Sequence, residues 1–311
     1  MTTTMRQISQ QAYGGPDVLQ LTEVPLPEPG LTEIRVKVSA AGVNPADWKT
    51  RRGDWDVFAP PFALGWDVSG IVDAVAPGVT RFRPGDEVYG MPRFPQLPGG
   101  YGEYVTAPAR HFARKPANLS HEEAAALPLV SLTAWQALAD TANLQPHQRV
   151  LIHAAAGGVG HVAVQIAKAR GAYVIGTARQ AKHAWLRDLG AGELIDYTTT
   201  DFAEAVSDVD VVLDTIGGDY AQRSLRTLRP GGVFVTIVDH FGLEALRAPG
   251  IRVEGLLVEP DGTGLEAVTD LAEKGLLKPY LAKVFPLEQA AEAHRLGETD
   301  RTQGKIVLKV T

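Results

Sequence analysis

The sequence contains no cysteine among its 311 residues. Without thiols the chain cannot form disulfides, use a catalytic thiolate, or bind zinc and iron–sulfur clusters through cysteine. It also lacks any block of five or six like charges, and its net charge of −6 disfavours a broad nucleic-acid-binding surface. No run of 18 apolar residues and no apolar N-terminal segment occurs, so neither a membrane span nor a secretory signal is predicted. We therefore expect a cytoplasmic protein that binds neither nucleic acid nor membrane.

The most informative feature present is a glycine-rich turn between a strand and a helix. An apolar run, Val150–Ile152, leads into Ala-Ala-Ala-Gly-Gly-Val-Gly at 154–160, and apolar residues then recur every third or fourth position. Such a unit offers a phosphate free N–H groups and the positive end of a helix dipole. Ala155 replaces the first glycine of the usual G-x-G-x-x-G pattern. The residues that we predict to bind the cofactor in this turn are Gly157, Gly158 and Val159.

Strand-like and helix-like segments alternate after this turn. The further strand-like runs are Tyr173–Thr177, Leu194–Asp196, Val209–Leu213, Val233–Val238 and Ile251–Val258. The helix-like segments between them lie near 181–189, 200–207 and 219–228. Six strands alternating with helices predict a doubly wound parallel sheet. Because the last run is apolar and terminal, we expect it to pair across a two-fold axis, which makes the protein a homodimer.

The end of the second strand indicates which dinucleotide binds. An NAD site usually has Asp or Glu there, about 20 residues after the glycines, to accept hydrogen bonds from the ribose. This chain has none and instead presents Arg179 and Lys182, which would attract a 2′-phosphate. We predict NADPH. The alternative is that Arg179 and Lys182 simply lie at the start of a solvent-exposed helix. Residues at the ends of the fourth and fifth strands, where such folds bind ligands, are Thr215, Ile237, Val238 and Asp239.

Residues 1 to about 122 differ from the rest of the chain in their sequence pattern. Short β-like runs are interrupted by proline and glycine, which predicts a compact, mostly β domain. Ser120-His-Glu-Glu123 is a capping-box-like helix start, and we place the domain boundary there.

Short motifs occur in a fixed order along nearly the whole chain. They are Ala40-Ala-Gly-Val-Asn-Pro-Ala-Asp47, Gly65-Trp-Asp-Val-Ser-Gly70, Arg83-Pro-Gly-Asp-Glu-Val-Tyr-Gly90, Gly99-Gly-Tyr-Gly-Glu-Tyr104, Leu132-Thr-Ala134, Ala154-Ala-Ala-Gly-Gly-Val-Gly160, Arg229-Pro-Gly-Gly232 and Gly304-Lys-Ile-Val-Leu308. In order and spacing they resemble the zinc-free quinone oxidoreductases, a zeta-crystallin-like family of the medium-chain dehydrogenase/reductase superfamily. The resemblance implies a GroES-like catalytic domain (1–122 and 263–311) and an inserted Rossmann NADPH-binding domain (123–262).

The resemblance also bears on metals. Zinc-dependent alcohol dehydrogenases of that superfamily bind catalytic zinc through a cysteine and a histidine, at positions that look like Asn44 and Trp66 here. Neither residue supplies that ligand set, and the eight histidines show no shared ligand spacing. We therefore predict no metal site.

Without zinc or cysteine, the chemistry that remains is hydride transfer from the cofactor to an electron-poor acceptor, and a quinone is expected. By resemblance, Asn44 contacts the cofactor or the substrate carbonyl, Thr133 hydrogen-bonds the cofactor and Tyr197 lies against the 2′-phosphate. Asp47 is expected to orient its loop. Lys49 stands where related quinone reductases often have tyrosine. In an apolar cleft its ammonium would stabilise an enolate oxygen or donate a proton, and the alternative is that the side chain extends to solvent.

Aromatic side chains of the N-terminal domain offer flat surfaces for a planar acceptor, with core packing as the alternative. The predicted substrate-pocket residues are Trp48, Trp55, Trp66 and Tyr101. Two other functions stay open. A functional Lys49 favours an NADPH-dependent reductase of alkenals, enones or enoyl thioesters, and tight NADPH binding without turnover would indicate a sensor or RNA-binding protein.

Overall fold

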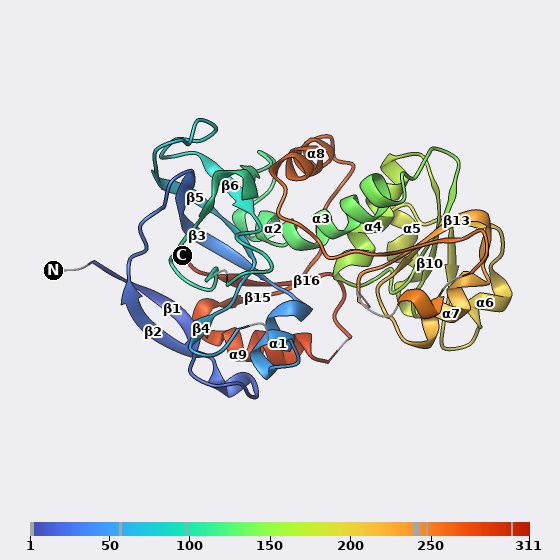
Figure 1. Ribbon diagram of the computed structural model, residues 1–311, viewed down its shortest axis with the longest axis horizontal. Helices are drawn as coiled ribbons and strands as arrows, with labels where there is room; N and C mark the ends of the chain where they lie inside the picture. The colour runs from blue at the N-terminus through green and yellow to red at the C-terminus, as the bar shows by residue number, and fades with distance from the viewer. Residues whose placement is uncertain (1–2, 56–57, 98, 239–242, 247, 300) are drawn as a thin grey trace. The chain divides into compact units, whose positions relative to one another are not determined.

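The computed structural model describes residues 3–55, 58–97, 99–238, 243–246, 248–299 and 301–311 (Figure 1). The chain divides into two compact units. Unit 1 comprises Met1–Leu129, Glu259–Lys274 and Pro279–Thr311, and unit 2 comprises Val130–Val258 and Gly275–Lys278. Among the described residues, no helix is long and apolar enough to cross a membrane.

Unit 1 is built mainly from strands. These are β1 (Thr4–Gln10), β2 (Gln20–Pro25), β3 (Glu33–Val43), β4 (Phe62–Ala63), β5 (Asp67–Val75), β6 (Glu87–Gly90), β7 (Tyr104–Pro108), β8 (Phe112–Arg114), β15 (Leu281–Pro286) and β16 (Lys305–Lys309). Its helices are α1 (Pro45–Arg52), α2 (His121–Ala125), α8 (Gly262–Glu273) and α9 (Ala290–Gly297), with 3-10 turns at Pro16–Val18, Ala109–His111 and Leu287–Gln289.

The strands of unit 1 form two sheets. One has the order β2-β1-β4, and the other, seven-stranded, has the order β15-β16-β3-β5-β6-β8 with β7 paired to β3. Strand β3 alternates in burial, with Ile34, Val36 and Val38 fully buried, as expected of a strand with one face in the core. The C-terminal strand β16 pairs antiparallel with the end of β3, which places Ile306 opposite Val43. This pairing brings the chain's tail beside the loop that starts α1.

Unit 2 contains a six-stranded sheet and its helices. The strands are β9 (Arg149–Ile152), β10 (Tyr173–Thr177), β11 (Glu193–Ile195), β12 (Val209–Asp214), β13 (Leu228–Thr236) and β14 (Arg252–Gly255). The helices are α3 (Pro128–Trp135), which spans the unit boundary, a π-helix (Gln136–Thr141), α4 (Gly158–Ala169), α5 (His183–Asp188), α6 (Phe202–Ala205) and α7 (Asp219–Leu225). Short 3-10 turns lie at Gln180–Lys182 and Leu243–Leu246.

All neighbouring strands of this sheet are parallel, in the order β11-β10-β9-β12-β13-β14. Numbered within the unit, the order is 3-2-1-4-5-6, that of a doubly wound dinucleotide-binding fold. Its core draws Leu151, Ile175, Val212 and Phe234 from four successive strands of the sheet. The predicted fold class, a mostly β domain plus a doubly wound parallel sheet, is confirmed.

Details differ from the sequence prediction in ways that packing explains. The predicted domain boundaries, 122/123 and 262/263, both lie within unit 1, because α2 packs on β3 and α8 packs on β8. Helix α3 begins at Pro128 and is continued after Trp135 by the π-helix Gln136–Thr141. Strand β1 was not predicted because only Met5, Ile8 and Gln10 along it are buried, which leaves a weak apolar pattern.

Candidate functional site

In unit 2 the glycine-rich turn joins β9 to α4. Ala154 adopts a positive φ of 45°, and its N–H donates to Oγ1 of Thr177 at 3.2 Å. The next N–H, of Ala155, donates to the Thr177 carbonyl at 3.0 Å. A Cβ at Gly160 would lie 2.3 Å from the Ala154 carbonyl oxygen, so only glycine fits there. The turn is thus held tightly against β10 and forms a backbone cradle.

Helix α4 starts directly after this turn, with Gly157 at its N-cap. The first N–H groups of a helix have no intrahelical acceptor, and the helix dipole adds positive potential at the same end. The predicted residues Gly157, Gly158 and Val159 are all half-buried here. Both the close approach at Gly160 and the helix start fit a pyrophosphate.

Two exposed polar side chains lie beyond the ends of β10 and β11. Nε of Arg179 donates to the hydroxyl of Tyr197 at 3.1 Å. The neighbouring carboxylate, Asp196, accepts the backbone N–H of Gln180 at 2.9 Å and that of Thr198 at 2.9 Å. The Thr198 hydroxyl also donates to this carboxylate at 2.6 Å, and this bond, together with the two backbone N–H groups, lowers the pKa of Asp196. The charge offered to a ligand here is therefore that of Arg179, which fits a 2′-phosphate.

The ends of β12 and β13 are held by hydrogen bonds. Oγ1 of Thr215 donates to the His153 carbonyl at 2.9 Å. Buried Asp214 accepts hydrogen bonds from the N–H groups of Ile216 and Gly217 and from the hydroxyl of Thr236. Its carboxylate therefore holds the loop that follows β12. Ile237 and Val238 are half-buried at the same edge, whereas predicted Asp239 lies outside the described residues. Thr133 is buried in α3.

In unit 1 the loop before α1 carries a buried polar cluster, whose members are Asn44, Asp47, Asp67 and Lys305. Nδ2 of Asn44 donates to Oδ2 of Asp67 at 2.9 Å, and Nζ of Lys305 donates to Oδ1 of Asn44. Asp47, at the third position of α1, accepts the N–H groups of Asn44 at 2.8 Å and Gly65 at 3.0 Å. These two hydrogen bonds tie the Asp47 carboxylate to the backbone at Asn44 and Gly65.

Burial dominates the electrostatics of this cluster. Removal from water raises the pKa of Asp47 to about 7, against the opposing effect of its backbone hydrogen bonds. Burial also raises the pKa of Asp67, although the ammonium of Lys305 opposes this. The pKa of Lys305 is lowered by burial, partly offset by Asp67 and Asp47. Each charge here depends on its partners.

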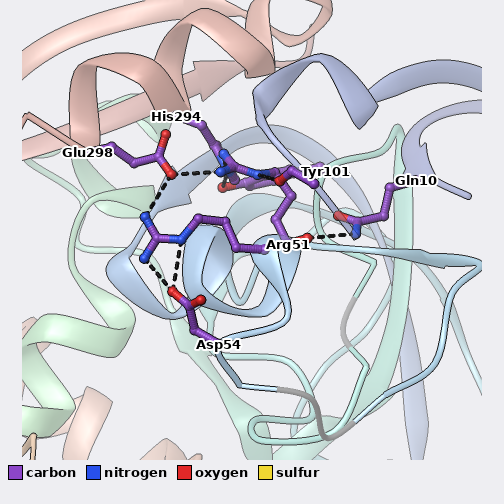
Figure 2. Close-up of polar contacts among 8 residues, drawn as sticks. Gln10, Arg51, Asp54, Tyr101, His294 and Glu298 are labelled. Carbon is purple, nitrogen blue, oxygen red and sulfur yellow. Dashed lines mark hydrogen bonds and ion pairs between the residues drawn. The ribbon is translucent and has the colours of Figure 1, made fainter. Parts of the chain in front are cut away.

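A second buried group links α9 to α1 (Figure 2). The Arg51 guanidinium binds Glu298 at 2.6 Å and donates to Nδ1 of His294 at 3.2 Å. A neutral His294 that accepts at Nδ1 carries its proton on Nε2, which lies 3.2 Å from the Tyr101 hydroxyl. Burial and Arg51 lower the pKa of His294 to about 3, so this ring is neutral. The Tyr101 hydroxyl in turn interacts with Asp47, and its pKa is raised mainly by burial.

Several predicted pocket residues pack in the core of unit 1 instead. Trp66 is fully buried and donates Nε1–H to the Gln96 carbonyl at 2.8 Å. Tyr101 is fully buried against His294, and Trp48 packs against the same ring. The packing of these three rings favours the alternative of core packing that the sequence left open, and their contact with substrate stays a prediction. Trp55 is half-buried.

Lys49 is solvent-exposed in the last turn of α1. The apolar surroundings that we expected for its ammonium are therefore not found, since the side chain extends to water. The buried polar cluster lies on the other side of α1, where Asp47 and Arg51 are buried.

Sequence reasoning missed Asp67, Lys305 and His294 as members of polar clusters. A signal was present, because Asp67 and Lys305 each begin a strand and are each followed directly by an apolar residue, Val68 and Ile306. A charged side chain in such a strand is buried only with a partner of opposite charge. Which partner it meets depends on the pairing of β5 and β16 with β3, which the sequence does not specify.

The residues at the two positions compared with zinc ligands do not fit a metal. Asn44 is engaged with Asp67 and Lys305, and Trp66 lies in the core. In the part of the chain that the structure describes, no group of three or more His, Cys, Asp or Glu side chains is placed to hold a metal ion.

Comparison with known proteins identifies two family regions. Residues 30–117 match the alcohol dehydrogenase GroES-like domain, and residues 189–308 match the family described as zinc-binding dehydrogenase. The first match lies in unit 1, and the second runs from unit 2 into the C-terminal part of unit 1.

Similar proteins match most of the chain or nearly all of it. The structure of a quinone oxidoreductase from Coxiella burnetii superimposes with a TM-score of 0.93 at 36% identity, covering 99% of this chain and 100% of that one. A 2-haloacrylate reductase from Burkholderia sp is 35% identical over 95% of this chain and 96% of its own length. Polyketide synthase GfsB from Streptomyces halstedii is 39% identical over 89% of this chain, which spans only 5% of that protein.

Proposed function

Because this chain belongs to the zinc-free quinone oxidoreductase family of the medium-chain dehydrogenase/reductase superfamily, we propose that it is an NADPH-dependent, zinc-independent quinone reductase. That membership makes it an oxidoreductase of a family that uses a nicotinamide cofactor. In the proposal, unit 2 binds the cofactor and unit 1 carries the acceptor site.

The observation that carries the choice of NADPH is the Arg179–Tyr197 pair beyond β10 and β11. Its guanidinium is exposed, while the adjacent carboxylate of Asp196 is occupied by backbone N–H groups. An anionic 2′-phosphate is stabilised by such a guanidinium, and Lys182 would add a second positive charge. NAD sites provide a carboxylate at the end of the second strand to accept a hydrogen bond from the ribose 2′-hydroxyl, and the residues after β10, Ala178 to Lys182, include no Asp or Glu.

The chain's own groups hold the reactants in place. The N–H groups at Gly157, Gly158 and Val159 would bind the pyrophosphate, and Thr133, Thr215, Ile237, Val238 and Asp239 would complete the cofactor site. Bound NADPH supplies the hydride. Since Oδ1 of Asn44 is engaged by Lys305, its contact with a cofactor amide or substrate carbonyl would come from the second Nδ2 hydrogen.

The electrons and protons of quinone reduction balance without a metal ion. A hydride carries one proton and two electrons, so a quinone held beside bound NADPH would need one further proton, from water, to become the hydroquinone, with NADP⁺ as the other product. Charge arriving on the conjugated ring delocalises onto the carbonyl oxygens, where a positioned N–H donor lowers its energy. Trp55, half-buried near α1, is the pocket aromatic that we retain for contact with a planar acceptor.

A second candidate function is reduction of a carbon–carbon double bond conjugated to a carbonyl. Its support is the similarity to 2-haloacrylate reductase over nearly the full length of both chains. In that case the substrate is an alkenal, enone or enoyl thioester, and exposed Lys49 is the proposed proton donor or oxyanion partner.

The test is NADPH oxidation followed at 340 nm with a planar ortho-quinone and a medium-chain 2-alkenal in parallel. We expect fast turnover with the quinone and little with the alkenal. The reverse result would replace the quinone assignment with the double-bond reductase. Tight NADPH binding with no turnover on either would favour a sensor or RNA-binding protein.

We also propose a cytoplasmic homodimer formed through the strand near Ile251–Val258. Strand β14 ends the six-stranded sheet, and Leu257 just beyond it is 43% exposed. A hollow of about 550 Å³ beside this strand is lined partly by Ile251 and Val253. Light scattering should give twice the 33.3 kDa chain mass, and Leu257→Lys should reduce it. A single-chain mass for the wild type would end this proposal.

A further inference from the structure

The ammonium of Lys305 is surrounded by oxygen acceptors. Nζ donates to the Val43 carbonyl at 3.0 Å and to Oδ1 of Asn44, and it lies 3.4 Å from Oδ2 of Asp67. An ammonium group has three N–H donors, so these three acceptors satisfy it completely. The side chain is only 3% exposed, which means that water does not compete for these hydrogen bonds.

This arrangement permits one orientation of the Asn44 amide. Its oxygen faces the Lys305 ammonium and its nitrogen faces the Asp67 carboxylate. A flipped amide would place N–H donors against an ammonium and an oxygen against a carboxylate, which are two repulsive contacts in a buried site. Lys305 and Asp67 together therefore fix the direction of both Nδ2 hydrogens.

We propose that Lys305 is a positioning residue that acts through Asn44. Its buried ammonium locks the amide so that one Nδ2 hydrogen stays with Asp67 and the other stays directed for an acceptor on the cofactor or substrate. The inference rests on the proposed function, because the positioned donor matters only if Asn44 contacts the reactants. It assigns to the C-terminal strand β16 a part in the reaction that its sequence alone does not reveal.

Lys309 provides a matched control on the same strand. It is 57% exposed and pairs with Glu122 at the surface. Lys305→Met and Lys309→Met make the same chemical change on β16, but only the first removes a donor from the Asn44 amide. A general effect of losing a lysine from this strand would appear in both variants.

The first readout is spectroscopic and independent of turnover. The chain has three asparagines, Asn44, Asn118 and Asn143, of which only Asn44 is buried. In ¹⁵N-asparagine-labelled protein, the side-chain signals lost in Asn44→Asp identify that amide. We expect its hydrogens to exchange with D₂O at least about tenfold faster in Lys305→Met and unchanged in Lys309→Met. Unchanged exchange in Lys305→Met would overturn the proposed lock.

The second readout is kinetic. We expect Lys305→Met to lower kcat with the preferred acceptor about tenfold or more, with the Kd for NADPH within about twofold of wild type. Equal loss in Lys309→Met, or unchanged kcat in Lys305→Met, would overturn the proposal. If the wild type turns over neither the quinone nor the alkenal, the proposed function fails, whereas the exchange experiment still decides whether Lys305 fixes Asn44.

A paired variant guards against misfolding. Removing one member of a buried ion pair leaves an uncompensated charge, so Lys305→Met alone is a destabilising change. Lys305→Met with Asp67→Asn removes both charges and keeps the volumes similar. We expect this pair to recover the melting temperature of the wild type but to keep the low kcat and fast amide exchange. Recovery of wild-type kcat would show that Lys305 acts only by neutralising Asp67.

Discussion

Nζ of Lys305 and Oδ2 of Asp67 lie 3.4 Å apart, and both side chains are shielded from solvent. Asp67 begins β5 and Lys305 begins β16, and these two strands flank the end of β3 from opposite sides. The two charged groups come into contact across the end of β3 because the register of β5 on β3 places Asp67 opposite Gly42. This meeting organises the loop that leads into α1.

Gly42 is required for that meeting. A Cβ there would lie 2.4 Å from the Ala125 carbonyl oxygen and 2.8 Å from Cβ of Asp67. We expect Gly42→Ala to lower the free energy of unfolding by about 1 to 3 kcal/mol, since backbone and carboxylate must both shift. Gly15→Ala is the control because nothing lies within 4 Å of its Cβ and its φ is −66°. Equal urea midpoints for the two variants would contradict the packing that we describe.

Arg51 and Arg52 make a second matched pair, since both bind Oε1 of Glu298. The Arg51 side chain is 1% exposed and that of Arg52 is 40% exposed. Arg51→Met should destabilise the protein by about 2 to 4 kcal/mol, because the buried His294 ring and the Gly14 carbonyl each lose their hydrogen-bond donor. Arg52→Met should cost about 0 to 1 kcal/mol, as for an exposed ion pair. Thermal unfolding of both variants checks the difference, and similar melting temperatures would refute it.

Asp47 predicts a pH dependence of stability. Its pKa is raised from 3.8 to about 7 by burial, so the folded protein binds a proton that the unfolded chain releases. Stability is retained below about pH 4 and is lost as the pH rises to about 7.

Asp47→Asn removes this proton equilibrium. From pH 5 to pH 8, the unfolding free energy of the wild type should fall relative to the variant by about 2 kcal/mol. Urea unfolding at the two pH values measures the change. A wild type that gains stability over the variant as pH rises would show that the folded-state pKa is depressed.

The sequence was sufficient for the parallel sheet of unit 2, because its strands are apolar runs separated by helical periods and its glycine turn has a local signature. It was not sufficient for the polar clusters of unit 1. Asp67 and Lys305 are 238 residues apart, and only the pairing of β16 with β3 brings them together. Trp66 and Tyr101 were ambiguous for a related reason, since an aromatic side chain suits a pocket and a core equally well until its neighbours are known.

Arg179 should determine the choice between cofactors. We expect Arg179→Ala to raise KM for NADPH roughly tenfold, because a charge-assisted hydrogen bond to the 2′-phosphate is lost, and to leave KM for NADH within about twofold. Arg187→Ala, at an exposed arginine of α5, is the control for general loss of positive charge. Steady-state kinetics with both cofactors measures the effect, and equal changes for NADPH and NADH would remove Arg179 from the phosphate site.

The central claim is that this chain passes hydride from NADPH to a quinone without a metal. The most direct measurement is an anaerobic reaction of the EDTA-treated protein with a limiting amount of NADPH and a planar ortho-quinone. Both the loss of absorbance at 340 nm and the hydroquinone formed would be quantified. We predict one hydroquinone for each NADPH oxidised, at a rate that EDTA leaves unchanged. An absence of NADPH oxidation despite demonstrable NADPH binding, or activity that returns only with added zinc, would contradict the account.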